Sequence, residues 1–237
     1  MPKFQAIIFD LDDTLYLERD YVFSGFSAVA RWAAAHLGVD ASATCEQFGD
    51  LYMEGVRGII FDTWLAQQQL DGGIYKDALV RVYREHEPCI EVDGEVRHLL
   101  DDLRSEYKLG LITDGYQAVQ KRKLAALGLD QYFHATVLSD EFGRQYWKPH
   151  EKPYLEILTR IQCDASRSVF VGDNPQKDFF GAKNVGMFSI RLSQPGGVYS
   201  HLAPSDSRYR ADLEIRDLGQ LRKAIGQLEQ VARSSAE

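Results

Sequence analysis

Short apolar runs alternate with amphipathic helical stretches through most of this chain, and this alternation narrows the folds that it can adopt. Residues 4–9 form the first run, and after Pro88 each strand-like run is followed by a helical one. The later strand-like runs are at residues 109–112, 135–138, 168–171 and 187–190. Strands that alternate with helices form βαβ units, in which the strands are parallel and buried on both faces. The sequence therefore predicts an α/β fold with a Rossmann-like parallel sheet and helices on both faces.

The segment between the first two strand-like runs has a different pattern. Three helices are predicted there, at residues 22–37, 44–56 and 75–86. Gly72 and Gly73 predict a turn between two of these helices, and Pro88 predicts the end of the last one. So long an insertion is not an ordinary connection between a strand and its neighbour. We expect a core domain of residues 1–15 and 89–237, and an inserted helical cap domain of residues 16–88.

The composition argues against several classes of partner. The 237 residues carry a formal net charge of -8, so we expect neither nucleic acid nor an anionic membrane surface to bind, because both are polyanions. No stretch is apolar enough for a membrane span, and the run that ends at Asp10 is too short for a signal peptide. The three cysteines form no Cys-x-x-Cys pair, which is typical of free thiols in a reducing compartment. We expect a cytoplasmic protein, and the sequence leaves open whether it is a homodimer.

Polar clusters follow four of the strand-like runs, at the end of the strand or in the loop after it. They are residues 10–14, residues 113–115, Lys148 with Pro149, and residues 172–174 with Asp178. In an open α/β sheet, the carboxyl ends of the parallel strands form one crevice, and ligands bind there. We therefore expect these clusters, which lie far apart in the sequence, to meet at one site.

The residue types in the clusters favour phosphoryl transfer. Several carboxylates in one crevice repel one another unless a cation is bound, and oxygen ligands suit Mg²⁺. A lysine can neutralise part of the remaining charge, and a threonine hydroxyl with neighbouring backbone N–H groups can bind phosphate oxygens. A carboxylate nucleophile can then form an acyl-phosphate. A second carboxyl two residues later can protonate the leaving oxygen and afterwards activate water.

The four clusters resemble, in order, the four motifs of the haloacid dehalogenase-like (HAD) hydrolase superfamily. The matching motifs are Asp-Leu-Asp-Asp-Thr-Leu from Asp10, Thr-Asp-Gly from Thr113, Lys148-Pro149, and Gly-Asp-Asn from Gly172 with Asp178. The resemblance covers residues 4 to about 190, and the cap between the first two motifs is similar to the helical-cap subclass. It implies a Mg²⁺-dependent phosphatase that hydrolyses a small phosphorylated metabolite through an aspartyl-phosphate. A sugar phosphate or a nucleoside monophosphate is the expected kind of substrate.

The resemblance also implies roles for individual residues. Asp10 matches the nucleophile and a metal ligand. Asp12 matches the general acid/base, whose backbone carbonyl also binds the metal. Thr113 matches the phosphate-binding hydroxyl, with the backbone N–H of Asp114 beside it, and Asp173 matches the acidic metal ligand.

The remaining motif residues leave alternatives open. Lys148 matches the lysine that contacts the nucleophile and the phosphate, but Lys152 and Pro153 form a second Lys-Pro pair close by. We favour Lys148 because Lys152 falls at the start of a predicted helix. Asp178 is either a partner of metal-bound water or a structural residue at a helix start. Asp114 stands where these proteins commonly have asparagine, and the extra carboxylate is expected to alter substrate contacts.

Tyr16 and Arg19 are the predicted substrate contacts outside the motifs. They come just after the nucleophile loop, near the hinge of the cap, where a side chain faces the expected crevice. The alternative is that they only pack or cap a helix.

Other functions remain open at this point. A dehalogenase of the same fold displaces a halide, which leaves without a proton, so Asp12 favours phosphoryl chemistry over that reaction. A phosphomutase, which returns the phosphoryl group to the substrate, is not distinguished by the sequence. From another class, a non-catalytic phospho-ligand-binding or signalling protein is the alternative.

Overall fold

The structure is a computed structural model, and it describes residues 4–234. The chain divides into two compact units. One unit holds the residues up to Glu18 and those from Glu91 onward, and the other is Arg19–Ile90. The sequence-based boundaries lie after residues 15 and 88.

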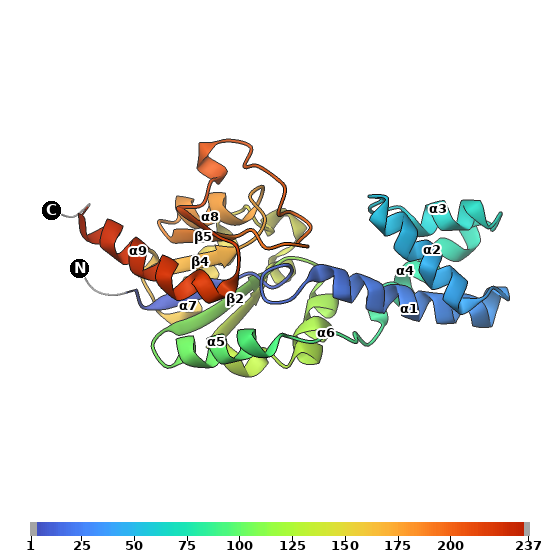
Figure 1. Ribbon diagram of the computed structural model, residues 1–237, viewed down its shortest axis with the longest axis horizontal. Coiled ribbons are helices and arrows are strands. Elements are labelled where there is room, and N and C mark those ends of the chain that lie inside the picture. The colour runs from blue at the N-terminus through green and yellow to red at the C-terminus, as the bar shows by residue number, and fades with distance from the viewer. Residues whose placement is uncertain (1–3, 235–237) are drawn as a thin grey trace. The chain divides into compact units, whose positions relative to one another are not determined.

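The first unit is built on a six-stranded sheet with the order β3-β2-β1-β4-β5-β6 (Figure 1). All of its strand pairs are parallel. The strands are β1 (Ala6–Phe9), β2 (Lys108–Thr113), β3 (Ala135–Leu138), β4 (Ser168–Gly172), β5 (Phe188–Leu192) and β6 (Leu213–Ile215). The predicted parallel α/β fold is confirmed. The sequence pattern did not predict β6, because three residues are too few to establish a period.

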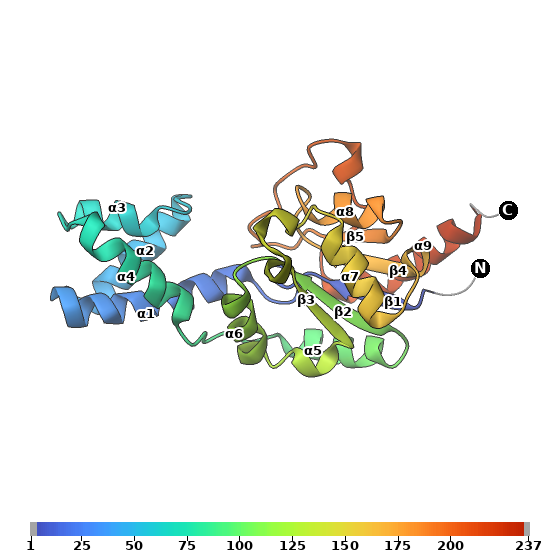
Figure 2. The ribbon, with the colours of Figure 1, turned by 180° about the vertical axis from the view of Figure 1, so that it is seen from behind.

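Helices cover both faces of this sheet, as predicted. They are α5 (Gly94–Arg104), α6 (Gln117–Leu127), α7 (Lys152–Ile161), α8 (Asp178–Asn184) and α9 (Leu221–Ser234). Figure 1 shows α9 in front of the sheet, and Figure 2 shows α7 in front of the opposite face. The buried side chains of α7 recur three or four residues apart, so one stripe of the helix packs on the sheet. Tyr154 and Ile157 on this stripe belong to one buried cluster with Ile8 and Phe170 of the sheet.

The strand order reverses beside β1, which lies between β2 and β4. Phe9, the last residue of β1, is in register with Leu111 of β2 and Val171 of β4. Sheets of this order bind ligands in the crevice outside the carboxyl ends of the strands, at the point of reversal. The loops that follow β1 and β4 therefore stand at the expected binding position, and they carry Asp10 and Asp173.

The second unit is helical and has its own core. Its helices are α1 (Glu18–Leu37), α2 (Ala41–Met53), α3 (Ile60–Gln67) and α4 (Gly72–Glu85). The first residue of α1, Glu18, still belongs to the first unit. Large buried side chains, Phe26, Phe48 and Trp64 among them, make up the core. In the described part of the chain, no helix is long and apolar enough to cross a membrane.

Two details of this unit differ from the prediction. The sequence pattern missed α3, whose eight residues make barely two turns and give a weak periodic signal. The turn expected at Gly72 and Gly73 is wrong, because α4 begins at Gly72. The side chain of Asp71 caps this helix by accepting the backbone N–H of Gly73 at 2.8 Å, which holds both glycines in the first turn.

Candidate active site

Asp10 lies where the predicted clusters meet. Its backbone N–H donates to the carbonyl of Val171 at 2.8 Å, so the β1–β4 pairing continues one residue past the strand and fixes where the loop starts. The residue is 2 % exposed. The sheet thus holds one carboxyl group at the carboxyl end of β1 and keeps it away from bulk water.

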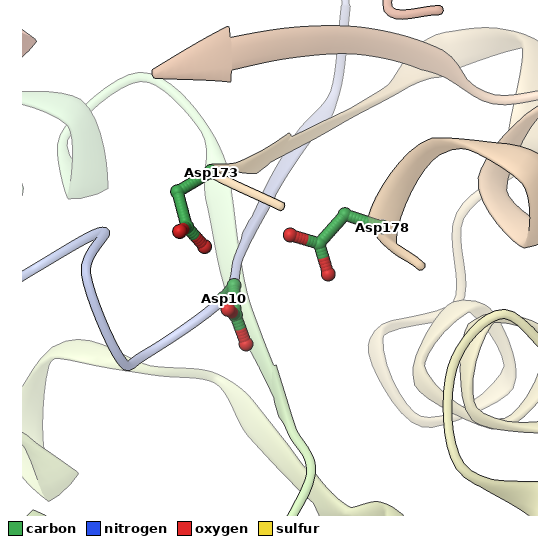
Figure 3. A group of neighbouring side chains, drawn as sticks. All are labelled: Asp10, Asp173 and Asp178. Atoms are coloured by element: carbon green, nitrogen blue, oxygen red, sulfur yellow. The ribbon is translucent and has the colours of Figure 1, made fainter. Parts of the chain in front are cut away.

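Three carboxyl groups gather at this point, from Asp10, Asp173 and Asp178. One oxygen from each lies within 4.8 Å of the other two, and Figure 3 shows the three side chains as neighbours. Burial, together with the nearby carboxylates of Asp178 and Asp10, raises the pKa of Asp173 to about 9. Burial also raises the pKa of Asp10 to about 6, although Lys148 opposes the shift.

These carboxyl groups fit a divalent cation. Oδ2 of Asp173 is buried and has no hydrogen-bond partner among the described residues, so a lone pair in the cluster is left without a donor. A buried oxygen without a partner is costly, and a bound cation would satisfy it. Hard oxygen donors of this kind suit Mg²⁺. The sequence left the role of Asp178 open, and in the structure this residue lies in the cluster beside the predicted ligands Asp10 and Asp173.

Lys148 lies in the centre of the site. Its Nζ is 2.6 Å from Oδ1 of Asp10 and 2.8 Å from Oδ1 of Asp178, and its side chain is completely buried. Burial alone would lower the pKa of Lys148, but the surrounding carboxylates outweigh it and raise that pKa, so the lysine is a cation. Lys152 starts α7, as predicted, and its Nζ lies 4.7 Å from the ring centroid of Phe142. Of the two lysines, Lys148 is the one that touches Asp10.

Asp178 has a structural role as well. Its Oδ2 accepts the backbone N–H of Asn174 at 2.8 Å, which closes the turn between β4 and α8. Tyr154, buried on α7, donates its hydroxyl to the carbonyl of Asp178 at 2.6 Å. Asp178 therefore both belongs to the carboxylate cluster and fixes the start of α8.

Asp12 is held by a set of donors that the sequence analysis did not identify. Lys123 places its Nζ 2.7 Å from Oδ1, and Gln120 donates to Oδ2 at 2.9 Å. The hydroxyl of Tyr16 also donates to Oδ1. Burial alone would raise the pKa of Asp12, but Lys123, Tyr16 and Gln120 outweigh it and lower that pKa. Asp12 is therefore an anion in this structure.

Gln120 also organises the predicted phosphate-binding residues. Its Nε2 donates to the hydroxyl oxygen of Thr113 at 2.9 Å and to the carbonyl of Asp114. Thr113 is the last residue of β2 and is 1 % exposed. Gln120 and Lys123 lie one turn apart on α6, so a single face of this helix serves both Thr113 and Asp12.

The two predicted contacts outside the motifs have different surroundings. Tyr16 is buried, and its hydroxyl donates a hydrogen bond to Asp12. Arg19 belongs to the second unit, its side chain is half exposed, and its Nε lies 3.8 Å from Oδ1 of Asp20. A role of either residue in binding substrate stays a prediction.

Asp13 joins segments that are distant in the sequence. Its Oδ1 accepts the backbone N–H of Glu18 at 2.9 Å, and its Oδ2 accepts that of Val198 at 2.8 Å. Gln194 donates to its carbonyl at 3.0 Å. The residue has a φ of 54°, a left-handed conformation that aspartate adopts more readily than most residues. Asp13 thus connects the loop after β5 to the loop after β1 and to the start of α1.

The chain is similar to proteins of one family. Residues 7–192 match the family model described as haloacid dehalogenase-like hydrolase. The glyceraldehyde 3-phosphate phosphatase of Methanothermobacter thermautotrophicus is 32% identical over 206 residues, which are 80% of this chain and 85% of that protein. The pyrimidine 5'-nucleotidase YjjG of Escherichia coli is 29% identical, over 83% of this chain and 91% of that protein.

A solved structure gives the same picture of the fold. The crystal structure of a 2-haloacid dehalogenase from Pseudomonas syringae pv. Tomato matches with a TM-score of 0.65 and 26% identity. The match covers 95% of this chain and 99% of that one.

Proposed function

This chain belongs to the haloacid dehalogenase-like hydrolase family and is a phosphoric monoester hydrolase, and we propose that it uses Mg²⁺ and an aspartyl-phosphate on Asp10. The observation that carries the proposal is the contact between Lys148 and Asp10 at 2.6 Å within the cluster of three buried carboxyl groups. A nucleophile needs its carboxylate ionised, and a cation beside it favours that form. Relatives named as phosphatases and as a nucleotidase support a phosphate monoester as the substrate.

Asp10, Asp173 and Asp178, with the backbone carbonyl of Asp12, are the groups that would hold the metal. When bound, Mg²⁺ would offset the charge of the carboxylates and of the phosphoryl oxygens. Lys148 would keep Asp10 ionised and oriented, and the hydroxyl of Thr113 and the N–H of Asp114 would bind phosphoryl oxygens.

The reaction would then take two displacements. In the first, Asp12 has taken up a proton, either from solvent or from the water of the preceding turnover. A carboxylate oxygen of Asp10 bonds to phosphorus, the bond from phosphorus to the substrate oxygen breaks, and Asp12 gives that oxygen its proton. In the second, Asp12 takes a proton from water, the water oxygen bonds to phosphorus, and the bond to Asp10 breaks to release phosphate. Lys123 and Tyr16 hold Asp12 as an anion, which is the form required for the second displacement.

The substrate class that we propose is a small phosphorylated metabolite, such as a sugar phosphate or a nucleoside monophosphate. A cytoplasmic location stays a prediction, as does the inserted cap, whose bounds we place at residues 16–88. Whether the protein is a homodimer stays open.

The test is phosphate release from an aryl phosphate and from a panel of phosphorylated metabolites, each with Mg²⁺ and with EDTA. We expect activity only with Mg²⁺, and none in Asp10→Asn. Labelled substrate should leave its label on wild-type Asp10 after rapid acid quenching. Activity that persists in EDTA, or a label on another residue, would contradict the proposal.

The second candidate is dehalogenation, which the likeness to a 2-haloacid dehalogenase favours. Halide release from 2-chloropropionate tests it directly. A dehalogenase would keep that activity in Asp12→Asn, because a halide needs no proton to leave. A phosphomutase would instead move a labelled phosphoryl group to a second position of the substrate without releasing it.

A further inference from the structure

The feature that the proposed mechanism does not use is the ion pair between Asp114 and Lys177. Nζ of Lys177 lies 3.3 Å from Oδ2 of Asp114. The other oxygen of Asp114 accepts the backbone N–H of Lys148 at 3.1 Å. One carboxylate therefore joins the loop that carries the central lysine to a second lysine, which immediately precedes α8.

Asp114 on its own would oppose binding of phosphate. Its backbone N–H is the proposed donor to a phosphoryl oxygen, so its carboxylate sits within a few ångströms of a dianion. Burial alone would raise the pKa of Asp114, but Lys177 and Lys148 outweigh it and lower that pKa, so the group is charged. A like charge at such a distance in a partly buried site repels the phosphate and weakens its binding.

The charges around the proposed nucleophile balance when both members of the pair are present, and they do not balance when only one member is present. Four carboxylates, on Asp10, Asp114, Asp173 and Asp178, face two lysines, Lys148 and Lys177. The remaining two negative charges equal the charge of one Mg²⁺. Removing Lys177 alone leaves the metal-loaded site one charge too negative, and removing the charge of Asp114 alone leaves it one too positive.

We infer that Lys177 is a positioning and charge-compensating residue, and that its pairing with Asp114 lets the site accept a phosphate dianion where a bare carboxylate would repel it. The inference rests on the proposed function, because it needs a phosphoryl group bound between Asp10 and Thr113. Because the net charge of the Asp114–Lys177 pair is zero, the pair has the same effect on the charge of the site as a neutral side chain at position 114. The substrate it favours is a phosphate monoester in its dianionic form.

The structure offers variants that separate charge from shape. Asp114→Asn removes the charge and keeps an oxygen that can accept the N–H of Lys148. Lys177→Met removes the cation and keeps most of the length of the side chain. The double variant restores the net charge of the wild-type site. Lys183→Met is the matched control, because Lys183 lies on α8, the helix that Lys177 precedes, and its side chain pairs with Asp212 at 3.6 Å and is one-third exposed.

The experiment measures the dissociation constant of inorganic phosphate with saturating Mg²⁺ by calorimetry, and kcat/KM on an aryl phosphate. Lys177→Met should weaken phosphate binding and lower kcat/KM by on the order of 10- to 100-fold, for one uncompensated charge at several ångströms. Adding Asp114→Asn should return both quantities to within about threefold of wild type, since the two changes are coupled. Asp114→Asn alone should bind phosphate at least as tightly as wild type, and Lys183→Met should behave as wild type.

The outcomes separate the inference from the proposed function. If the double variant stays as weak as Lys177→Met, or if Lys177→Met binds phosphate normally, the compensating role is wrong. If wild type neither binds phosphate nor hydrolyses any phosphate monoester, the proposed function is wrong. Lys177→Arg keeps the charge and should retain phosphate binding, so it tests the same point should the methionine variant fail to fold.

Discussion

The carboxylate cluster makes Mg²⁺ binding depend on pH in a defined direction. Without metal, the pKa of Asp173 is about 9, against an ordinary value of 3.8. Between those values the folded protein holds a proton on Asp173 that the unfolded chain has lost. The free energy of unfolding of the metal-free protein should therefore fall as pH rises through this window. Asp10, with a pKa raised to about 6, adds to the effect only below that pH.

The size of the effect follows from the same shift. The raised pKa means that ionising Asp173 in the metal-free fold costs on the order of 5–7 kcal/mol more than in the unfolded chain. Mg²⁺ binds the ionised carboxylate, so binding must expel the proton. The affinity for Mg²⁺ should rise by up to about tenfold for each pH unit between pH 6.5 and 8.5, with up to about one proton released for each ion bound.

Isothermal titration calorimetry of EDTA-treated, dialysed protein measures both quantities. Titrations in two buffers of different ionisation enthalpy give the number of protons released, and the pH series gives the affinity. Asp173→Asn is the comparator and should release no proton and show a nearly flat affinity. A wild-type affinity that is independent of pH, with no proton released, would refute the argument that a buried, protonated Asp173 binds the ion.

Three further outcomes are expected. In Gly181→Ala the new Cβ would lie 2.5 Å from the carbonyl oxygen of Pro149 and from the ring of Tyr154. The free energy of unfolding, measured in urea, should therefore fall by about 1–3 kcal/mol. An unchanged free energy of unfolding would mean that these neighbours move aside without cost. Asp12→Asn should slow hydrolysis of alkyl phosphates by about 10²–10⁴-fold and of a good aryl leaving group much less, and equal losses would exclude the acid role. Lys123→Met should also slow hydrolysis of alkyl phosphates more than that of the aryl phosphate, but by a smaller factor, and Lys123→Arg should keep part of the activity. An equal loss on both substrates would contradict the inference that Lys123 acts through Asp12.

The sheet could be predicted from the sequence because its strands are buried on both faces. A strand such as β1 is a continuous apolar run, and the polar residues after it are easily recognised. The same logic placed Asp10, Thr113 and Asp173 at one edge, since parallel strands bring their carboxyl ends together. These are signals that a single segment carries by itself.

The remaining parts of the site depend on packing that no single segment reveals. Gln120 and Lys123 are polar residues on a helix, which usually face solvent, and only the docking of α6 buries them against Asp12. Lys177 is one of several polar residues before a short helix, and its partner lies 63 residues away. Asp13 was one of three aspartates in the first motif, and its hydrogen bonds run to Glu18 and Val198.

The position of β1 in the sheet has a consequence for synthesis of the chain. β1 is made first, yet its two neighbours are β2 and β4, which begin at residues 108 and 168. Contacts between segments so distant in the sequence form late, whereas the helices of residues 19–90 find their partners within a short stretch. On the ribosome, Asp10 therefore lacks the neighbours Lys148, Asp173 and Asp178 until the chain has been made past residue 178. Closure of the sheet, and with it the proposed metal binding, is thus expected only after β4 and the start of α8 have emerged.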